Sequence, residues 1–435
     1  RITVTLAYTE LVSNDYLTAR GRSGYFVSDT APRPPKFAAS APVVDGVDWA
    51  RAIGQRYSSY TPLARPPDWR SYRFPFIYGQ ADATLFDHQN WRLCALKALG
   101  QRDFEALTAD YYEADDARLV EFITRHILPR RGIAAQPDEV LLTLGAQNAL
   151  WLSAQVLLTQ RRTAAFENPG YPGLREILEQ TRCKLQPIDV DGEGLRPDAL
   201  ARDTDVVFTT ASHHCPTNVT MPVARRRALL ERAARDGFVV VEDDYEFEVS
   251  FSKSPAPALK SLDRTGAVIY IGSFSKSVFP GLRLGYLVGS ATFIREARAL
   301  RALVLRHPPG HLQRTAAYFL SLGHYDAQVN RMGAAYRERR LVMEMAIREH
   351  GLIKSGQGTA GQGAAGQGTG GQGTGGGSSF WMQTPEEVNS SDLALLLRQK
   401  GVLIEPGQAF FAREEHNQRH YRLAYSSISP GRIAE

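Results

Sequence analysis

The chain contains little cysteine, with 3 cysteines among 435 residues. Cys94, Cys183 and Cys215 lie far apart and show none of the paired spacings that disulfide frameworks and zinc sites require. A small secreted domain held by disulfides is therefore excluded. The composition fits a protein of the reducing cytoplasm, and this is the location that we expect.

Long hydrophobic runs are also missing. No stretch approaches the roughly 18 uninterrupted apolar residues that a membrane-spanning helix needs, and the first residues do not read as a signal peptide. We therefore expect no membrane partner. The chain begins with Arg1 rather than methionine, and its first residues read as the middle of a structural element. We expect the protein to extend further upstream.

Charge of one sign is not in large excess. Lys and Arg number 51 against 46 Asp and Glu, a net charge of +5, which over this length does not by itself indicate nucleic acid. Basic residues do gather near the start of the chain, where acidic residues are few. With 43% hydrophobic and 22% charged residues, the length predicts two or three globular domains.

The most informative feature is a lysine between two serines, shortly after an apolar run at residues 267–271. Ser273, Ser275 and Lys276 follow that run, and Arg283 comes soon after. Open α/β sheets bind ligands at the carboxyl ends of their strands. The hydroxyls and the arginine suit a phosphate, and the lysine could form an imine with an aldehyde. Together they predict a site for pyridoxal 5'-phosphate (PLP); a surface lysine in a serine-rich turn is the alternative.

Residues 1–28 form a separate unit. Residues 3–12 place their apolar side chains on one helical face, and residues 16–20 and 24–28 read as two short strands. A helix followed by a basic hairpin is typical of a winged helix-turn-helix, in which the helix meets a DNA groove and the hairpin meets phosphates. An ordinary helix–hairpin packing element is the alternative. The candidate DNA-binding residues are Arg1, Thr3, Thr5, Arg20 and Arg22.

The remainder divides by composition. Residues 29–73 are rich in Pro, Ala and Arg and predict an extended linker. From residue 74 to 435, apolar strands alternate with amphipathic helices, which predicts an α/β fold with a doubly wound, mostly parallel sheet. Its large domain covers about residues 100–300. The strands expected there are residues 140–144, 163–166, 206–210, 238–242 and 267–271, and the helices include residues 147–158 and 223–236.

A second, smaller α+β domain is expected at about residues 301–435. Its expected strands are residues 380–383, 402–404 and 421–425. Four Gly-rich repeats interrupt it at residues 356–377. They have no apolar side chains whose burial could offset the entropy of ordering them, so we interpret this insert as a surface loop without a chemical role.

Two further motifs lie at the ends of the expected strands. Asp243 comes directly after the expected strand at residues 238–242 and could pair with the pyridine nitrogen of the cofactor, while Tyr245 could hydrogen-bond the cofactor's phenolic oxygen. A solvated acidic turn is the alternative. Ala146 and Gln147 lie where a strand passes through a glycine turn into a helix, and free N–H groups at such a helix start can bind phosphate.

Three more positions allow both a functional and a structural interpretation. Tyr171 follows residues 163–166 and could stack on a planar cofactor, or could be a structural tyrosine. His213, His214 and Cys215 suggest a metal, but adjacent histidines point apart and no other ligand cluster is present, so no metal site is expected. Arg422 lies inside an apolar strand, where it could meet a substrate carboxylate or form a structural salt bridge.

Taken in order, these motifs resemble the PLP-dependent fold type I proteins, which are similar to aspartate aminotransferase. With the helix–hairpin unit in front, the chain resembles the MocR-type transcriptional regulators of the GntR superfamily, in which a winged helix-turn-helix is fused to an aminotransferase-like domain. Residues 74–79 and 129–133 also resemble sequence segments of that family. We expect residues 1–28 to be the C-terminal part of the winged helix, and a chain without the upstream helices to bind DNA poorly while still binding PLP.

The resemblance implies a role for each site residue. Lys276 would form the internal aldimine, Asp243 would pair with the pyridine nitrogen, Tyr245 would contact the phenolic oxygen, and Tyr171 would stack on the ring. Arg422 would hold a substrate α-carboxylate. The residues around the phosphate would be Ala146, Gln147, Ser273, Ser275 and Arg283. Cys215 stands where aminotransferases have an asparagine that tunes the phenolic oxygen, which places efficient transamination in doubt.

Two main hypotheses follow. The first is a regulator that senses an amino compound through aldimine exchange at Lys276, with DNA as its partner. The second is an aminotransferase with a vestigial DNA-binding segment, and weak transaminase activity is compatible with both. A third hypothesis is an α/β binding protein that does not use PLP. The resemblance also implies a homodimer, because a second subunit usually completes such sites.

Overall fold

The computed structural model describes residues 2–32, 46–58, 65–80, 82–110, 113–249, 256–355, 377–412 and 418–435. The chain divides into two compact units, Arg1–Ser59 and Tyr60–Glu435. Most of the repeat insert expected at residues 356–377 and part of the linker expected at residues 29–73 lie outside the described residues. No helix among the described residues is both long enough and apolar enough to cross a membrane.

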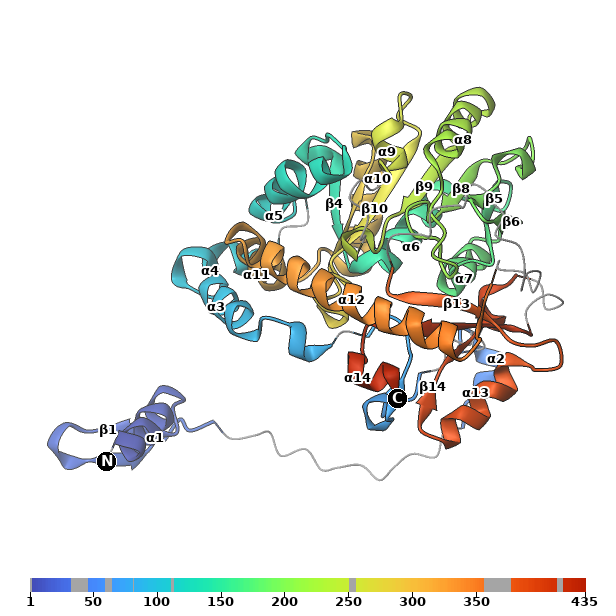
Figure 1. Ribbon diagram of the computed structural model, residues 1–435. Coiled ribbons are helices and arrows are strands. Elements are labelled where there is room, and N and C mark those ends of the chain that lie inside the picture. The colour runs from blue at the N-terminus through green and yellow to red at the C-terminus, as the bar shows by residue number, and fades with distance from the viewer. Residues whose placement is uncertain are drawn as a thin grey trace. The chain divides into compact units, whose positions relative to one another are not determined.

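The first unit contains a helix and a two-stranded hairpin (Figure 1). Helix α1 covers Ile2–Ser13, and strands β1 (Leu17–Ala19) and β2 (Tyr25–Val27) pair in antiparallel register. The rings of Tyr8 and Tyr25 lie 4.7 Å apart and join the helix to the hairpin. A short helix, α2 (Trp49–Ala52), lies in the stretch that we expected to be linker.

The second unit contains a mixed sheet of eight strands, in the order β4-β11-β10-β9-β8-β5-β6-β7. Strands β5, β6, β8, β9 and β10 run parallel to their neighbours in this set, whereas β11 is antiparallel to both β10 and β4. The strands are β4 (Val140–Thr143), β5 (Thr163–Asn168), β6 (Lys184–Asp191), β7 (Gly194–Leu195), β8 (Val206–Thr209), β9 (Val239–Asp243), β10 (Val268–Ser273) and β11 (Gly285–Val288).

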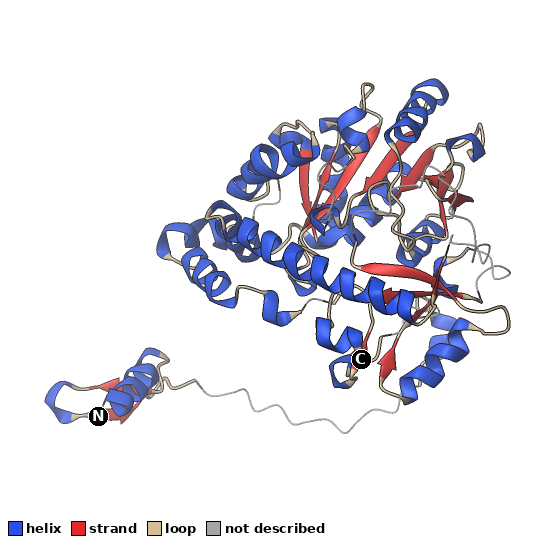
Figure 2. Cartoon of the chain, viewed as in Figure 1, coloured by secondary structure: helices blue, strands red, loops and turns tan. Residues whose placement is uncertain are grey.

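Helices cover both faces of this sheet (Figure 2). Apolar side chains of α6 (Gly145–Leu157), α7 (Pro172–Gln180) and α10 (Ala291–Leu305) pack on one face. On the other face lie α8 (Val223–Asp236) and α9 (Leu259–Leu262), together with α3 (His88–Ala98), α5 (Ala117–Phe122) and α11 (Gly310–Ser321). Helix α4 covers Gln101–Thr108. Successive residues of β9 enter different cores, Val240 on one side and Val241 on the other, as strand geometry requires.

The smaller domain is built on a four-stranded sheet in the order β12-β13-β16-β15. Its strands are β12 (Ile353–Lys354), β13 (Ser379–Gln383), β15 (Glu405–Pro406) and β16 (His420–Ala424), and it also contains the helices α13 (Ser390–Gln399) and α14 (Pro430–Ala434). Strand β14 (Val402–Leu403), which we expected in this domain, pairs instead with β3 (Phe74–Pro75) in a separate two-stranded sheet.

Helix α12 (His324–Glu349) joins the two domains of this unit (Figure 1). Tyr325 at its start packs in the core of the large domain, and Met343 and Ile347 near its end pack in the core of the small domain. One continuous helix therefore positions both sheets around the space between them.

The α/β fold class with a mostly parallel sheet, expected for residues 74–435, is confirmed. The strands expected in the large domain are all present with shifts of one or two residues at their ends, and α8 has the expected bounds of residues 223–236. The helix ends there because Gly237 takes the left-handed conformation, with φ of 81°. Strands β6 and β11 were not among those expected.

Candidate functional site

A cavity of about 260 Å³ lies at the carboxyl ends of the parallel strands and extends to the small domain. All of the residues that the sequence analysis assigned to the cofactor and its substrate line this cavity. They are Ala146, Gln147, Tyr171, Cys215, Asp243, Tyr245, Ser273, Ser275, Lys276, Arg283 and Arg422. Motifs separated by up to hundreds of residues in the chain therefore meet in one place.

Lys276 lies in the segment that follows β10, with its Nζ 4.2 Å from the centre of the Tyr78 ring. Burial lowers the pKa of Lys276 to about 8, and the positive charges of Arg65 and Arg422 act in the same direction, against nearby carboxylates that raise it. An appreciable fraction of neutral amine is therefore present near neutral pH. Such an amine can attack an aldehyde.

Asp243, the last residue of β9, has a buried Oδ1 atom without a hydrogen-bond partner. Burial raises the pKa of Asp243 to about 8, and the charges of Asp244 and Glu167 add to this effect. A buried carboxyl without a partner is unfavourable. This position is therefore suited to a molecule in the cavity that offers a cationic N–H donor.

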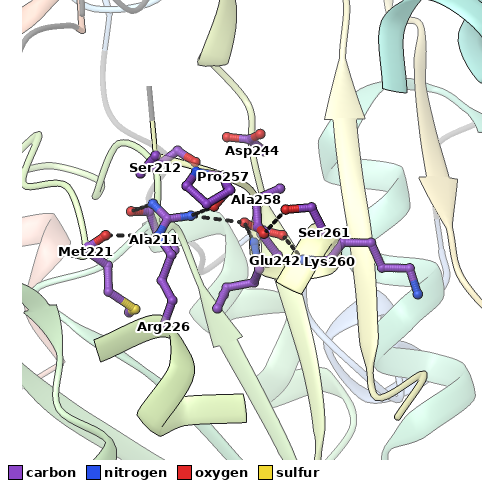
Figure 3. Close-up of polar contacts among 12 residues, drawn as sticks. Ala211, Ser212, Met221, Arg226, Glu242, Asp244, Pro257, Ala258, Lys260 and Ser261 are labelled. Atoms are coloured by element: carbon purple, nitrogen blue, oxygen red, sulfur yellow. Dashed lines mark hydrogen bonds and ion pairs between the residues drawn. The ribbon is translucent and has the colours of Figure 1, made fainter. Parts of the chain in front are cut away.

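Glu242, the residue before Asp243, is fully buried on the other side of the strand. Its carboxylate lies 3.7 Å from Arg226 and accepts backbone hydrogen bonds from Leu259 and Lys260, at 2.8 and 3.0 Å (Figure 3). Burial, followed by the charge of Asp244, raises the pKa of Glu242 to about 6. Arg226 also donates to the backbone carbonyls of Met221, Pro257 and Ala211. This network anchors the carboxyl end of β9 and thus the position of Asp243.

Another part of the cavity lining is suited to an anion. Helix α6 begins at Gly145, where φ is +74°, and no side chain caps its first turn. Its first backbone N–H groups are therefore free to bind a ligand. The Arg283 side chain approaches the same turn and donates to the backbone carbonyl of Leu144 at 3.3 Å. Ser273 Oγ accepts a hydrogen bond from Ser275 N at 3.2 Å and lies at the same end.

Tyr171, Cys215 and Tyr245 form the side wall of the cavity. The Tyr171 hydroxyl donates to Gln147 Oε1, and burial raises the pKa of Tyr171 to about 12. Burial also raises the pKa of Tyr245 well above its ordinary value, and that of Cys215 to about 12. All three side chains are thus neutral at physiological pH.

Arg422 lies on β16 and forms an ion pair with Glu405 of β15, with an Nε–Oε2 distance of 2.8 Å. Both side chains are buried. Of the two alternatives left open for this arginine, the salt bridge is present in the structure. Arg422 nevertheless also lines the cavity.

His213 and His214 do not gather further ligands. His214 Nδ1 lies 2.7 Å from Thr217 Oγ1, and its Nε2 lies 3.5 Å from Glu167 Oε2. Burial lowers the pKa of both histidines. Within the described part of the chain, no group of three or more His, Cys, Asp and Glu residues is arranged to hold a metal ion.

Some residues of the cavity wall had no role in the sequence analysis, among them Arg65, Tyr78, Thr210 and Phe410. Thr210 follows β8, and its Oγ1 donates to Glu167 Oε2 at 2.6 Å. A hydroxyl at the carboxyl end of a parallel strand is a signal that could have revealed it. Arg65 comes from the stretch expected to be linker, and no local pattern marks it or Phe410.

The candidate DNA-binding residues belong to the first unit. Thr3 and Thr5 are exposed on α1, and the exposed Arg20 lies at the end of β1 with its guanidinium carbon 5.1 Å from the centre of the Phe26 ring. Arg1 and the side chain of Arg22 lie outside the described part of the structure. The helix and hairpin predicted from the sequence are therefore both present.

Comparison with known proteins identifies the family. The profile of the family "Aminotransferase class I and II" matches residues 89–433. The "HTH-type transcriptional regulator TauR" of Rhodobacter capsulatus is 59% identical over 435 residues, which are 100% of this chain and 87% of that protein. The "Probable rhizopine catabolism regulatory protein MocR" of Rhizobium meliloti is 29% identical over 351 residues, 80% of this chain and 70% of that protein.

The chain belongs to the MocR-type transcriptional regulators. Its aminotransferase-like part has the fold of PLP enzymes of fold type I. The α-aminoadipate aminotransferase LysN of Thermus thermophilus superimposes with a TM-score of 0.77 at 24% identity, covering 89% of this chain and 96% of that one. The kynurenine aminotransferase of Pyrococcus horikoshii gives 0.76 at 24% identity, covering 89% and 95%.

As a MocR-type regulator, the protein uses PLP as its cofactor. The site residues fit this molecule. The unpartnered Oδ1 of Asp243 can accept a hydrogen bond from a protonated pyridine nitrogen. Arg283 and the first turn of α6 offer positive charge and N–H groups for the phosphate. When bound, PLP supplies an electrophilic aldehyde and an electron sink to the site.

Proposed function

We propose that this MocR-type regulator senses an amino compound at Lys276 and passes the response to DNA through its N-terminal helix–hairpin unit. The observation that carries the proposal is that Asp243, whose buried Oδ1 has no hydrogen-bond partner, and Lys276 line the same cavity, in a chain whose full length aligns with a transcriptional regulator. When PLP is bound, an amino compound would compete with the Lys276 amine for the cofactor aldehyde. Release of that amine favours a different arrangement of the two domains.

Within this proposal each cavity residue has a role. Asp243 would hold the pyridine nitrogen, Tyr245 and Cys215 would be placed to contact the phenolic oxygen, and Tyr171 would pack on the ring. Arg422 faces the effector side of the cavity. The phosphate contacts are Ala146, Gln147, Ser273, Ser275 and Arg283.

DNA is the macromolecular partner in this proposal, and Arg1, Thr3, Thr5, Arg20 and Arg22 are the proposed contacts. Positive side chains on the hairpin meet backbone phosphates, while the exposed threonines of α1 lie where a recognition helix meets a groove. The protein acts in the cytoplasm as a homodimer, whose two-fold symmetry then sets the spacing of the DNA half-sites.

A second function is favoured by the completeness of the site. Because every candidate cofactor residue, including the nucleophilic lysine, lines the cavity, an aminotransferase with a vestigial DNA-binding segment is the alternative. Both functions use the same amine chemistry at Lys276. The two functions differ in whether the protein binds DNA specifically and in whether it converts amino substrates catalytically.

A gel-shift titration of the full-length PLP-loaded protein, including any winged-helix segment that precedes Arg1, on the DNA upstream of its own gene tests the proposal. We expect a shift that weakens steeply with salt, because phosphate contacts release counterions, and that changes when amines are added. Arg20→Ala should weaken the shift, whereas Arg161→Ala, an exposed arginine of the second unit, should not. Absence of a salt-sensitive shift, together with steady transamination at about one turnover per second or faster, would support the alternative.

A further inference from the structure

Arg422, the arginine that a ligand carboxylate would bind, is already paired with a carboxylate of the protein, that of Glu405. Glu405 and Arg422 are direct partners in the antiparallel register of β15 and β16, and their side chains meet with an Nε–Oε2 distance of 2.8 Å. Their side chains are only 4% and 3% exposed. Because the backbone register aligns the two residues, the ion pair does not depend on a flexible loop.

The rest of the Arg422 guanidinium is also enclosed. Its central carbon lies 4.0 Å from the centre of the Tyr78 ring and 4.7 Å from that of Phe410, so aromatic rings cover it. Nη1 lies 4.0 Å from Cys215 Sγ. A ligand acid can therefore reach this arginine only near the plane of the guanidinium, and Glu405 already holds one edge of that plane.

A second arginine strengthens the hold on Glu405. Arg65 Nε lies 3.0 Å from Glu405 Oε1, while Arg422 binds the other oxygen of the same carboxylate. Burial alone would raise the pKa of Glu405, but the charges of the two arginines outweigh it, so this pKa lies below its ordinary value. Glu405 is thus ionised, and it cancels one of the two positive charges that a ligand acid would otherwise meet.

We propose that Glu405 is a specificity-determining residue that occupies Arg422 and so selects amines that lack a carboxylate on the carbon bearing the nitrogen. An α-carboxylate reaching Arg422 has to share it with Glu405, and two carboxylates on one buried guanidinium repel each other. An amine without that carboxylate meets no such repulsion and leaves the ion pair intact. This inference rests on the proposed amine-sensing function and names the class of ligand for the same site.

The first test compares two amines on the PLP-loaded wild-type protein. L-alanine and ethylamine differ only by the carboxylate. Each amine is added to the protein in increasing amounts, at equal concentrations of unprotonated amine, and binding is followed by the change in the absorbance of the yellow protein. We expect L-alanine to bind no more than about threefold more tightly than ethylamine. Binding of L-alanine more than about tenfold tighter than ethylamine overturns the inference.

The second test uses Glu405→Gln, which keeps the shape of the side chain and removes its charge. We expect L-alanine to gain at least about tenfold in affinity while ethylamine changes less than about threefold, because Arg422 then has charge to offer a ligand carboxylate. Equal changes for both amines overturn the inference. The matched control is Glu386→Gln, the same change in an exposed ion pair with Arg419, which should alter neither affinity.

The two tests separate the inference from its premise. A wild-type protein that stays colourless with PLP, or whose colour responds to neither amine, overturns the proposed function and this inference with it. A coloured protein that strongly prefers L-alanine overturns the inference alone. If Glu405→Gln does not fold, the wild-type comparison still decides the question.

Discussion

Arg131 and Asp244 form a buried ion pair directly behind the site, with Arg131 Nε 2.7 Å from Asp244 Oδ2. Their side chains are 4% and 1% exposed. Tyr270 donates to the same carboxylate oxygen at 2.9 Å, and Arg131 also donates to Ser212 Oγ at 2.8 Å. Because Asp244 follows Asp243 in the chain, this pair helps to hold the cofactor-facing carboxyl in place.

Removing the arginine of this pair should destabilise the fold strongly. Arg131→Met leaves the Asp244 carboxylate buried without its counter-charge, and we expect the free energy of unfolding to fall by about 3–5 kcal/mol, measured by urea denaturation. The neighbouring Arg130→Met serves as control, because Arg130 pairs with Asp326 at an exposed site and should cost no more than about 1 kcal/mol. Equal losses in the two variants would refute a special role for the buried pair.

The Asp243 carboxyl should make the stability of the cofactor-free protein depend on pH. Its pKa is raised to about 8 in the folded state, so the folded protein keeps a proton that the unfolded chain loses. Its stabilising contribution is therefore present at acidic pH and is lost as the pH rises from about 4 to about 8. Between about pH 5 and about pH 7, we expect wild type to lose about 2–3 kcal/mol relative to Asp243→Asn.

Denaturant unfolding at the two pH values measures this difference. Asp138→Asn, a change at an exposed position, should shift stability equally at both. A difference between wild type and Asp243→Asn that does not change with pH would show that Asp243 titrates normally.

Lys276 should be the attachment point of PLP. Borohydride reduction of the PLP-loaded protein, followed by peptide mass mapping, should place the label on Lys276 and on no other lysine, because Lys276 is the only lysine among the described residues that line the candidate cavity. Lys276→Ala should yield no labelled peptide at this position and no yellow colour, whereas Lys184→Ala, at an exposed lysine, should behave as wild type. Persistent yellow colour in Lys276→Ala would assign the aldehyde to another amine.

The rate at which the protein captures added PLP should rise with pH around the lowered pKa of Lys276, which is about 8. Only the neutral amine attacks, and burial makes the charged form less favourable. Stopped-flow absorbance should give a midpoint near this value. Arg65→Gln should move the midpoint upward, since the charge of Arg65 lowers the pKa of Lys276. A wild-type midpoint close to that of an ordinary lysine would contradict the buried environment.

Local pattern was sufficient for most of the large domain. Strand β9 is a run of valines before its acidic end, and α8 lies between Pro222 and the left-handed Gly237, so propensity and stop signals agree with the final structure. It failed at β6 and β11. Strand β6 contains Pro187 and several polar residues, and β11 is a short strand that begins with a glycine shortly after Arg283. Pairing with neighbouring strands outweighs both local signals.

The sequence by itself determined that the cofactor residues meet. Parallel strands present their carboxyl ends at one edge of a sheet, so Asp243, at the end of one strand, and Lys276, just after the end of another, had to converge. Only the tertiary structure decided the partners of each charge. That Glu405 holds Arg422, that Arg65 reaches the same carboxylate, and that Asp243 has a buried oxygen without a partner depend on strand register and packing between distant segments, which local composition does not encode.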